Sequence, residues 1–177
     1  FPGSRQQEVN RHLPIFIKVV SLINNDNVQI IVGKAPQITL SKIPNNWKVE
    51  EDDTSLCLEY GTAVLTASGT ATLQSAVQDI PAVVSYKMSS GSWLLAKNMS
   101  KVPFAAMTNL IFGKQIVPEF LQADMTPKNL ANAIQPLLSN TAERKEMLIG
   151  YEQVRRTLGM PGVYERAGDA ILSRTFT

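Results

Sequence analysis

The feature that most constrains the fold is a strand–helix–strand pattern in the middle of the chain. Residues 63–67 and 82–86 are short apolar runs, and a helical pattern over about residues 70–78 separates them. One helix between two strands in so short a stretch forms a right-handed crossover, which makes the strands parallel. A third apolar run, at residues 28–32, ends at Gly33. The sequence therefore predicts an α/β fold with a doubly wound parallel sheet, its strands buried on both faces.

Helical patterns flank this region on both sides. Ser4 is a suitable N-cap for a first helix with apolar residues at helical spacing. Later in the chain one helix is predicted to begin at Pro127, a second to end at Gly159 and a third to follow Pro161. The 177 residues, 44% of them hydrophobic and 18% charged, suffice for one compact core. We expect a single domain closed by C-terminal helices.

Composition narrows the classes of function. The formal net charge of +2 is too small for the concentrated basic face of a nucleic-acid-binding protein, so nucleic acid is not an expected partner. Cys57 is the only cysteine, and in its apolar run we expect a buried thiol of a reducing compartment. No apolar run approaches the ~18 residues of a membrane span. Neither G-x-x-x-x-G-K-[ST] nor G-x-G-x-x-G occurs, which argues against a nucleotide hydrolase or a nicotinamide enzyme.

Two short stretches have the composition of an anion-binding helix N-terminus. Gly3-Ser4-Arg5 precedes the first helix, and Ser68-Gly69-Thr70 opens the helix between the two strands. The first turn of a helix has unpaired N–H groups and the positive end of the helix dipole, so it binds an anion without a cationic side chain. Arg5 adds a two-pronged donor. Together the two stretches predict a clamp for a diphosphate, beyond the carboxyl ends of the strands.

Five motifs, in this order and at these intervals, resemble the C-terminal half of the lipid-A-disaccharide synthases. They are Phe-Pro-Gly-Ser-Arg-x-x-Glu at residues 1–8, Ser-Gly-Thr-Ala-Thr-Leu at 68–73, Pro-Ala-Val-Val-Ser-Tyr-Lys at 81–87, Asn-Leu-Ile at 109–111 and Pro-Glu-Phe-Leu-Gln at 118–122. The resemblance covers nearly the whole chain. It implies the Rossmann-like C-terminal domain of a GT-B glycosyltransferase, as a fragment of a longer two-domain protein. It also implies that the final helix, within residues 160–177, packs toward the other domain.

The function implied by the resemblance is that of a hexosyltransferase of lipid A biosynthesis in Gram-negative bacteria. Such an enzyme transfers diacylglucosamine from UDP to a diacylglucosamine 1-phosphate acceptor, without a metal or other cofactor. The general base is expected in the other domain, so we assign no catalytic residue in this chain and expect the chain alone to be inactive. The implied location is cytoplasmic and peripheral to the inner face of the inner membrane, and a homodimer is left open.

The resemblance also assigns binding residues. The UDP-binding set is Gly3, Ser4, Arg5, Ser68, Gly69, Thr70 and Gln74. The set assigned to the donor sugar or uridine is Asn109, Glu119 and Gln122. Gln74 stands where the family usually has glutamate, so its bonds to ribose hydroxyls would be uncharged. Met107-Thr108 stands where Leu-Pro is usual.

Alternative interpretations remain at this point. Another GT-B enzyme, such as the peptidoglycan glucosaminyltransferase or a UDP-N-acetylglucosamine epimerase, would use the same clamp, and so would a non-catalytic nucleotide-sugar sensor. His12 is the only histidine and is expected to be structural. The acidic run at residues 50–53 is expected to be a solvated loop. Trp93, Leu94 and Leu95 are expected to pack on the sheet, with contact to a membrane surface as the alternative.

Overall fold

The computed structural model describes residues 1–23, 27–67, 69–89, 93, 103–160 and 162–175. Its helices and strands, in chain order, are α1 (Gln6–Val20), β1 (Ile31–Gly33), β2 (Lys48–Glu50), α2 (Leu56–Glu59), β3 (Val64–Thr66), α3 (Gly69–Val77), β4 (Ala82–Tyr86), α5 (Met107–Phe112), β5 (Glu119–Leu121), η1 (Gln122–Asp124), α6 (Pro127–Ile134), η2 (Gln135–Leu138), α7 (Ala142–Leu158) and α8 (Val163–Thr175).

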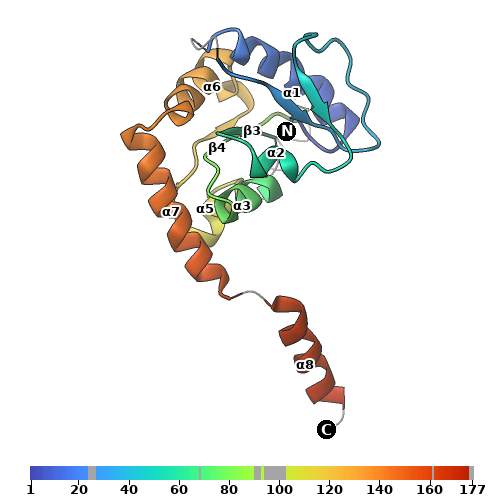
Figure 1. The fold of residues 1–177 in the computed structure, drawn as a ribbon, viewed down its shortest axis with the longest axis vertical. Coiled ribbons are helices and arrows are strands. Elements are labelled where there is room, and N and C mark those ends of the chain that lie inside the picture. The colour runs from blue at the N-terminus through green and yellow to red at the C-terminus, as the bar shows by residue number, and fades with distance from the viewer. Residues whose placement is uncertain (24–26, 68, 90–92, 94–102, 161, 176–177) are drawn as a thin grey trace.

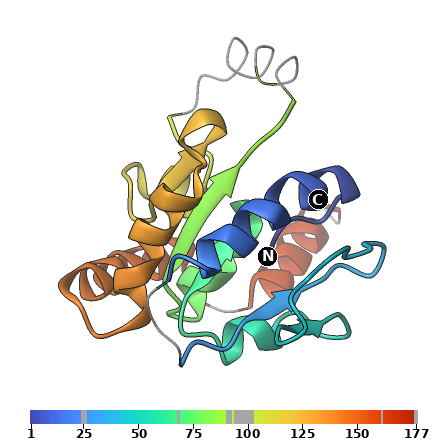
Figure 2. The same cartoon turned by 90° about the horizontal axis from the view of Figure 1, so that it is seen from above.

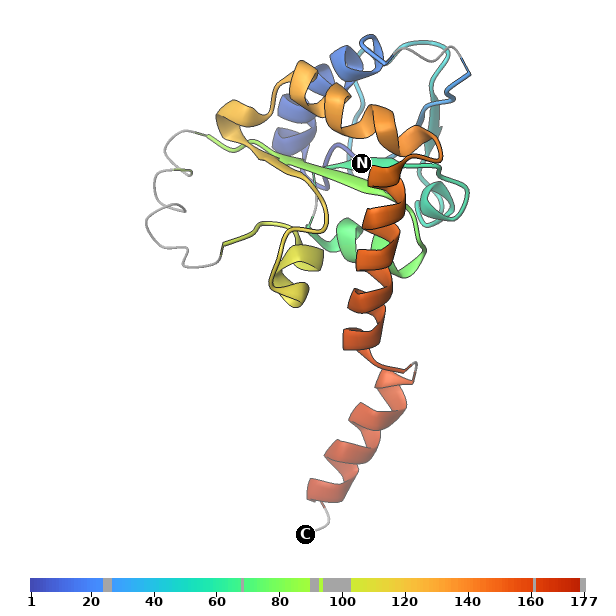
Figure 3. The ribbon, with the colours of Figure 1, turned by 90° about the vertical axis from the view of Figure 1, so that its left-hand side faces the viewer.

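The described strands form two parallel sheets. β3, β4 and β5 are adjacent in that order, with β4 and β5 side by side in Figure 2, and α3 is the crossover between β3 and β4. β1 and β2 form the second sheet, with Ile31 opposite Lys48. Figure 3 shows α1 and α6 on one face of the three-stranded sheet, with α3 and α5 on the other. The predicted α/β class and the predicted strand–helix–strand unit are confirmed.

The degree of burial differs between the two sheets. In β4 the residues from Ala82 to Ser85 are all buried, as expected for a strand covered by helices on both faces. In the two-stranded sheet, Ile31 and Val49 are each 40% exposed. The prediction that the apolar run at residues 28–32 would form a strand buried on both faces is therefore wrong, and β1 begins only at Ile31.

The C-terminal helices begin and end where the sequence predicts. The Thr126 hydroxyl accepts a hydrogen bond from the Asn129 N–H at the start of α6, and Thr141 caps α7 in the same way. α7 ends at Gly159, whose φ of 80° suits glycine. α8 then extends away from the rest of the chain (Figure 1), with Tyr164 88% exposed. The packing of this helix against another domain remains a prediction.

Two observations bear on the expected membrane contact. None of the helices in the described part of the chain combines the length and the apolar character needed to cross a bilayer. Leu94 and Leu95 lie outside the described residues, so neither the packing of the Trp93 segment on the sheet nor its alternative contact with a membrane is tested.

A close contact in α7 generates a stability prediction. A Cβ atom on Gly150 would lie 2.7 Å from Cγ2 of Ile116, so Gly150→Ala forces the backbone or Ile116 to shift. We expect it to lower the free energy of unfolding by about 1–3 kcal/mol, although alanine normally stabilises a helix relative to glycine. Gly168→Ala in α8 is the matched control, because a Cβ there has no neighbour within 4 Å. Urea unfolding of both variants is the measurement, and equal effects would contradict the contact.

Candidate anion-binding site

A pocket of about 340 Å³ lies where the starts of α1 and α3 approach each other. Gly3 and Ser4 line it just before α1, and Thr70 and Gln74 line it from α3. Four of the residues assigned to UDP therefore share one pocket, although they are far apart in the sequence. Gly69 is the first residue of α3, and Ser68 lies outside the described residues.

The pocket lies at the carboxyl ends of the strands. Gly33 is the last residue of β1 and lines the pocket, as does Ala35. α3 begins three residues after β3 ends. In open parallel α/β sheets this edge is where ligands bind, because the loops and helix N-termini converge there.

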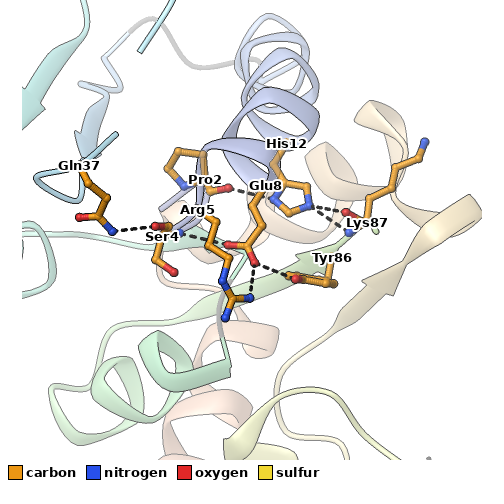
Figure 4. A network of polar contacts seen from close by, with 8 residues as sticks. All are labelled: Pro2, Ser4, Arg5, Glu8, His12, Gln37, Tyr86 and Lys87. Carbon is orange, nitrogen blue, oxygen red and sulfur yellow. Dashed lines mark hydrogen bonds and ion pairs between the residues drawn. The ribbon is translucent and has the colours of Figure 1, made fainter. Parts of the chain in front are cut away.

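The Glu8 carboxylate fixes the turn before α1, as Figure 4 shows. Its Oε2 accepts a hydrogen bond from the Ser4 N–H at 3.2 Å. Its Oε1 accepts from the Arg5 guanidinium at 3.3 Å and from the Tyr86 hydroxyl at 2.8 Å. Gly3 has a φ of 133°, and a Cβ there would lie 2.7 Å from the Glu8 Cβ, so the turn requires glycine. This buried carboxylate thus connects the turn to the end of β4.

The prediction that Ser4 is the N-cap of α1 is wrong. Arg5 occupies the N-cap position and makes no side-chain capping bond. The carboxylate of Glu8, the third helical residue, reaches back to the N–H of Ser4, one residue before the N-cap. The N–H groups of Gln6 and Gln7, in the first turn, have no acceptor within the helix. They are the donors that α1 offers to an anion.

The Arg5 side chain is available to a ligand. It is 80% exposed and is not among the residues that line the pocket. Its recorded ion pair is with Glu8, three residues later in the helix. Only the Arg5 side of this pair is exposed. If the guanidinium turns toward an incoming anion, the Glu8 carboxylate keeps its bonds from the Ser4 N–H and the Tyr86 hydroxyl.

His12 is a structural residue, as predicted. It is fully buried, its Nδ1 lies 2.9 Å from the Pro2 carbonyl oxygen, and its Nε2 accepts the Lys87 N–H at 3.0 Å. The Nε2 also lies 3.1 Å from the Lys87 carbonyl oxygen, and the Pro2 carbonyl beside Nδ1 requires a proton on that nitrogen for a hydrogen bond. Burial lowers the pKa of the imidazole from its ordinary value, against the opposing effect of the bond to Pro2. His12 thereby holds the segment before α1 next to the end of β4.

Asn109 and Glu119 are engaged with the protein itself. Asn109 is fully buried, and its Nδ2 donates to the Val117 carbonyl at 2.9 Å and to Glu119 Oε1 at 2.7 Å. Its Oδ1 accepts the N–H groups of Ile116 and Val117. The Glu119 carboxylate also accepts the N–H groups before α5, those of residues 105 and 106. These bonds join the start of α5 to β5, and neither side chain lines the pocket.

Gln122, unlike Asn109 and Glu119, has a buried side-chain group without a hydrogen-bond partner in the described part of the chain. It follows β5 with a φ of 52°, in the left-handed region that few residues other than glycine adopt. Its Nε2 is buried and has no hydrogen-bond partner among the described residues. Its assignment to the donor sugar remains a prediction, as does that of Asn109 and Glu119.

The sequence analysis missed part of the pocket wall. Asp53, Thr54 and Ser55 line the pocket. Residues 51–53 are exposed, in agreement with the prediction of a solvated loop, but their place in the pocket wall was not predicted. The Asp53 carboxylate accepts bonds from the N–H and the hydroxyl of Ser55, which lower the pKa of Asp53. The loop follows the carboxyl end of β2. The acidic residues make this loop recognisable in the sequence. Its place after a strand was not predicted, because β2 has a single apolar residue.

Fold and pocket place the chain in the class of Rossmann-like α/β domains, with helix N-termini converging beyond parallel strands. The sequence model described as lipid-A-disaccharide synthetase matches residues 1–171. The chain belongs to that family, and the resemblance seen in the five motifs is confirmed.

Curated relatives agree with this assignment. The chain is 35% identical to the lipid-A-disaccharide synthase of Solibacter usitatus (strain Ellin6076), over 96% of the chain and 46% of that protein. It is 31% identical to that of Myxococcus xanthus (strain DK1622), over 97% and 47%. For Prochlorococcus marinus (strain MIT 9313) the identity is 33%, over 99% and 49%. The chain thus spans about half the length of the curated relatives it matches.

The Asn109 network generates a prediction that separates a structural role from a direct ligand role. Asn109→Ala leaves the buried N–H groups of Ile116 and Val117 without their acceptor, so we expect the free energy of unfolding to fall by about 3 kcal/mol. The control is Asn10→Ala, which loses only an exposed bond to Gln6 and should change stability by less than about 0.5 kcal/mol. Unchanged stability of Asn109→Ala, together with lost donor affinity, would contradict the structural role.

The environment of His12 predicts a pH dependence of stability. Because folding lowers the pKa of His12 below 6.5, the unfolded chain takes up a proton at a pH where the folded chain does not. Stability is then complete above about pH 6.5 and falls as the pH drops, by at most about 1.4 kcal/mol per unit. Urea unfolding between pH 8 and pH 5.5 measures this, and His12→Gln should lack this component. Parallel curves for both proteins would contradict it.

Proposed function

We propose that this chain is the UDP-binding half of a lipid-A-disaccharide synthase. The observation that carries the proposal is the pocket in which the starts of α1 and α3 converge, lined by Gly3, Ser4, Thr70 and Gln74. It is supported by membership of the family over residues 1–171. The diphosphate of UDP is the ligand that fits two opposed helix N-termini, because each can bind one phosphate group.

In this proposal the first turn of α1 binds one phosphate and the start of α3 binds the other. The N–H groups of Gln6 and Gln7 point out of the helix, and Arg5 moves from Glu8 onto the phosphate as a charge-assisted donor. Thr70 is exposed and offers its hydroxyl to the other phosphate. Ser68 and Gly69 belong to the same turn and are proposed to act with it.

The rest of the donor has two places to bind. The wall formed by Gln74 and residues 53–55 is polar, so we place the ribose there, with the exposed Gln74 amide as donor and acceptor. We place the donor sugar near Gln122, whose buried Nε2 has a hydrogen bond to give. Asn109 and Glu119 would then act on the sugar through the α5 and β5 backbone that they hold together.

For the full-length protein we propose the complete transfer reaction. The donor is UDP-diacylglucosamine, the acceptor is diacylglucosamine 1-phosphate, and the general base comes from the other half. The N–H groups and Arg5 stabilise the negative charge that develops on the leaving UDP. The chain alone then holds the nucleotide and lacks the acceptor site. The enzyme is placed in the cytoplasm at the inner membrane surface, where both acylated substrates reside.

The proposal predicts that the full-length protein binds UDP more tightly than UMP, because the pocket is built for two phosphates. Arg5→Ala should weaken UDP binding by about 10- to 100-fold, the effect of one charge-assisted bond of about 1.5–3 kcal/mol. Arg156→Ala is the control, since Arg156 is exposed and pairs only with Glu152 in the described structure. Calorimetric titration gives all the constants.

Equal affinity for UDP and UMP would overturn the two-phosphate clamp. If Arg5→Ala binds UDP as tightly as the control does, Arg5 is a surface residue without a role in binding.

A further inference from the structure

One oxygen of the Glu8 carboxylate accepts hydrogen bonds from two side chains. Its Oε1 accepts the Tyr86 hydroxyl at 2.8 Å and the Arg5 guanidinium at 3.3 Å. A carboxylate oxygen has two lone pairs, so both donors can bind it at once. The two donors nevertheless compete for the same negative charge, and each is held less strongly than it would be alone.

The two donors differ in their freedom to move. Arg5 is 80% exposed and lies at the N-cap of α1. Tyr86 belongs to β4, where it pairs with Leu121 of β5, and its ring lies 5.4 Å from the ring of His12. The guanidinium can therefore turn away from Glu8 while the Tyr86 hydroxyl stays in place (Figure 4).

The Tyr86 hydroxyl remains a donor throughout. Burial raises the pKa of this phenol above its ordinary value, and the hydrogen bond to Glu8 raises it further. The phenol thus keeps its proton at neutral pH and donates it to the carboxylate. Because Glu8 is only 8% exposed, water is a poor substitute for this donor.

These contacts set the cost of moving Arg5 from Glu8 to a phosphate. With the Tyr86 hydroxyl in place, Oε1 keeps a hydrogen bond after the guanidinium has left. Without that hydroxyl, Arg5 is the donor that the described structure leaves at Oε1, and its departure leaves a buried charged oxygen unpaired. An unpaired buried charge is costly, so the guanidinium would stay with Glu8.

We propose that Tyr86 is a positioning residue that sets the affinity for UDP by allowing Glu8 to release Arg5. The inference rests on the proposed function, since it takes Arg5 to be a ligand of a UDP phosphate. Tyr86 is not among the residues that line the pocket at the starts of α1 and α3. It acts on the nucleotide through Glu8 and Arg5, by stabilising the carboxylate in the state in which Arg5 binds phosphate.

A purely structural role of Tyr86 leads to a different expectation. If its hydroxyl only kept the turn at residues 3–5 in shape, through Glu8 and the Ser4 N–H, its loss would weaken UDP binding whether or not Arg5 is present. The release of Arg5 requires the guanidinium itself, because without it no bond to Glu8 has to break. The two roles are therefore separated by the dependence of the Tyr86 effect on Arg5.

A double-mutant cycle in the full-length protein measures this dependence. Tyr86→Phe removes the hydroxyl and keeps the ring, and we expect it to weaken UDP binding by about 10-fold in calorimetric titration. In the Arg5→Ala background, the same change should weaken binding by less than about twofold. Tyr60→Phe is the matched control, since Tyr60 is 74% exposed and should leave the affinity unchanged.

Unchanged UDP affinity of Tyr86→Phe, or an equal loss in both backgrounds, would overturn the proposal. Either result leaves the proposed function standing, provided that Arg5→Ala alone weakens UDP binding. If Arg5→Ala binds UDP normally, both the role of Arg5 in the clamp and its release by Tyr86 are wrong.

A crystal structure of the unsubstituted full-length protein with UDP gives a second reading, which does not depend on the folding of a variant. The Tyr86 hydroxyl should still lie within about 3 Å of Glu8 Oε1, at hydrogen-bond distance, after the Arg5 guanidinium has left that oxygen. A guanidinium that remains on Glu8, or a Tyr86 hydroxyl that has moved away from it, would contradict the release.

Discussion

The buried Glu8 carboxylate is the interaction on which the candidate site depends. It holds the Ser4 N–H, the Arg5 guanidinium and the Tyr86 hydroxyl, which belong to the turn before α1 and to the end of β4. Glu8 is only 8% exposed, and a carboxylate is costly to bury unless its oxygens are hydrogen bonded. Three donors meet that requirement, and in doing so they fix the turn against the sheet. Gly3 and Ser4 of this turn line the pocket.

His12 supports the same arrangement from the next turn of the helix. Its ring lies against Tyr86, with centroids 5.4 Å apart, and contacts both Pro2 and Lys87. Glu8 and His12 thus face the same strand end from one helix (Figure 4). Glu8 orients the Ser4 N–H and the Arg5 guanidinium near the pocket. His12 instead holds the backbone of Pro2 and Lys87. Neither needs to contact a ligand to affect its binding.

The sequence predicts those features that depend on local pattern. Apolar runs and helical spacing predict β4, α3 and the parallel class, because β4 is buried from Ala82 to Ser85 and α3 buries one face. Thr126 and Gly159 mark helix ends through their own backbone and side-chain chemistry. The grouping of Gly3 and Ser4 with Thr70 and Gln74 also follows from the sequence, since both stretches have the composition of an anion-binding helix N-terminus.

Other features arise from contacts between distant residues and leave a weak local signal. β2 and β5 are three residues each, too short for a periodic pattern. The engagement of Asn109 by Ile116, Val117 and Glu119 depends on how α5 packs beside β5. Ser4 has the residue type of an N-cap, but Arg5 occupies that position, and the Glu8 carboxylate accepts the Ser4 N–H. In each of these cases tertiary contacts decide the outcome.

The central claim is that the starts of α1 and α3 bind the two phosphates of UDP. A crystal structure of the full-length protein with UDP tests it most directly. The account predicts phosphate oxygens within hydrogen-bond distance of the N–H groups of Gln6 or Gln7 on one side and of the Thr70 hydroxyl or N–H on the other, with Arg5 turned away from Glu8. A diphosphate bound elsewhere, with Arg5 still paired to Glu8, would contradict it.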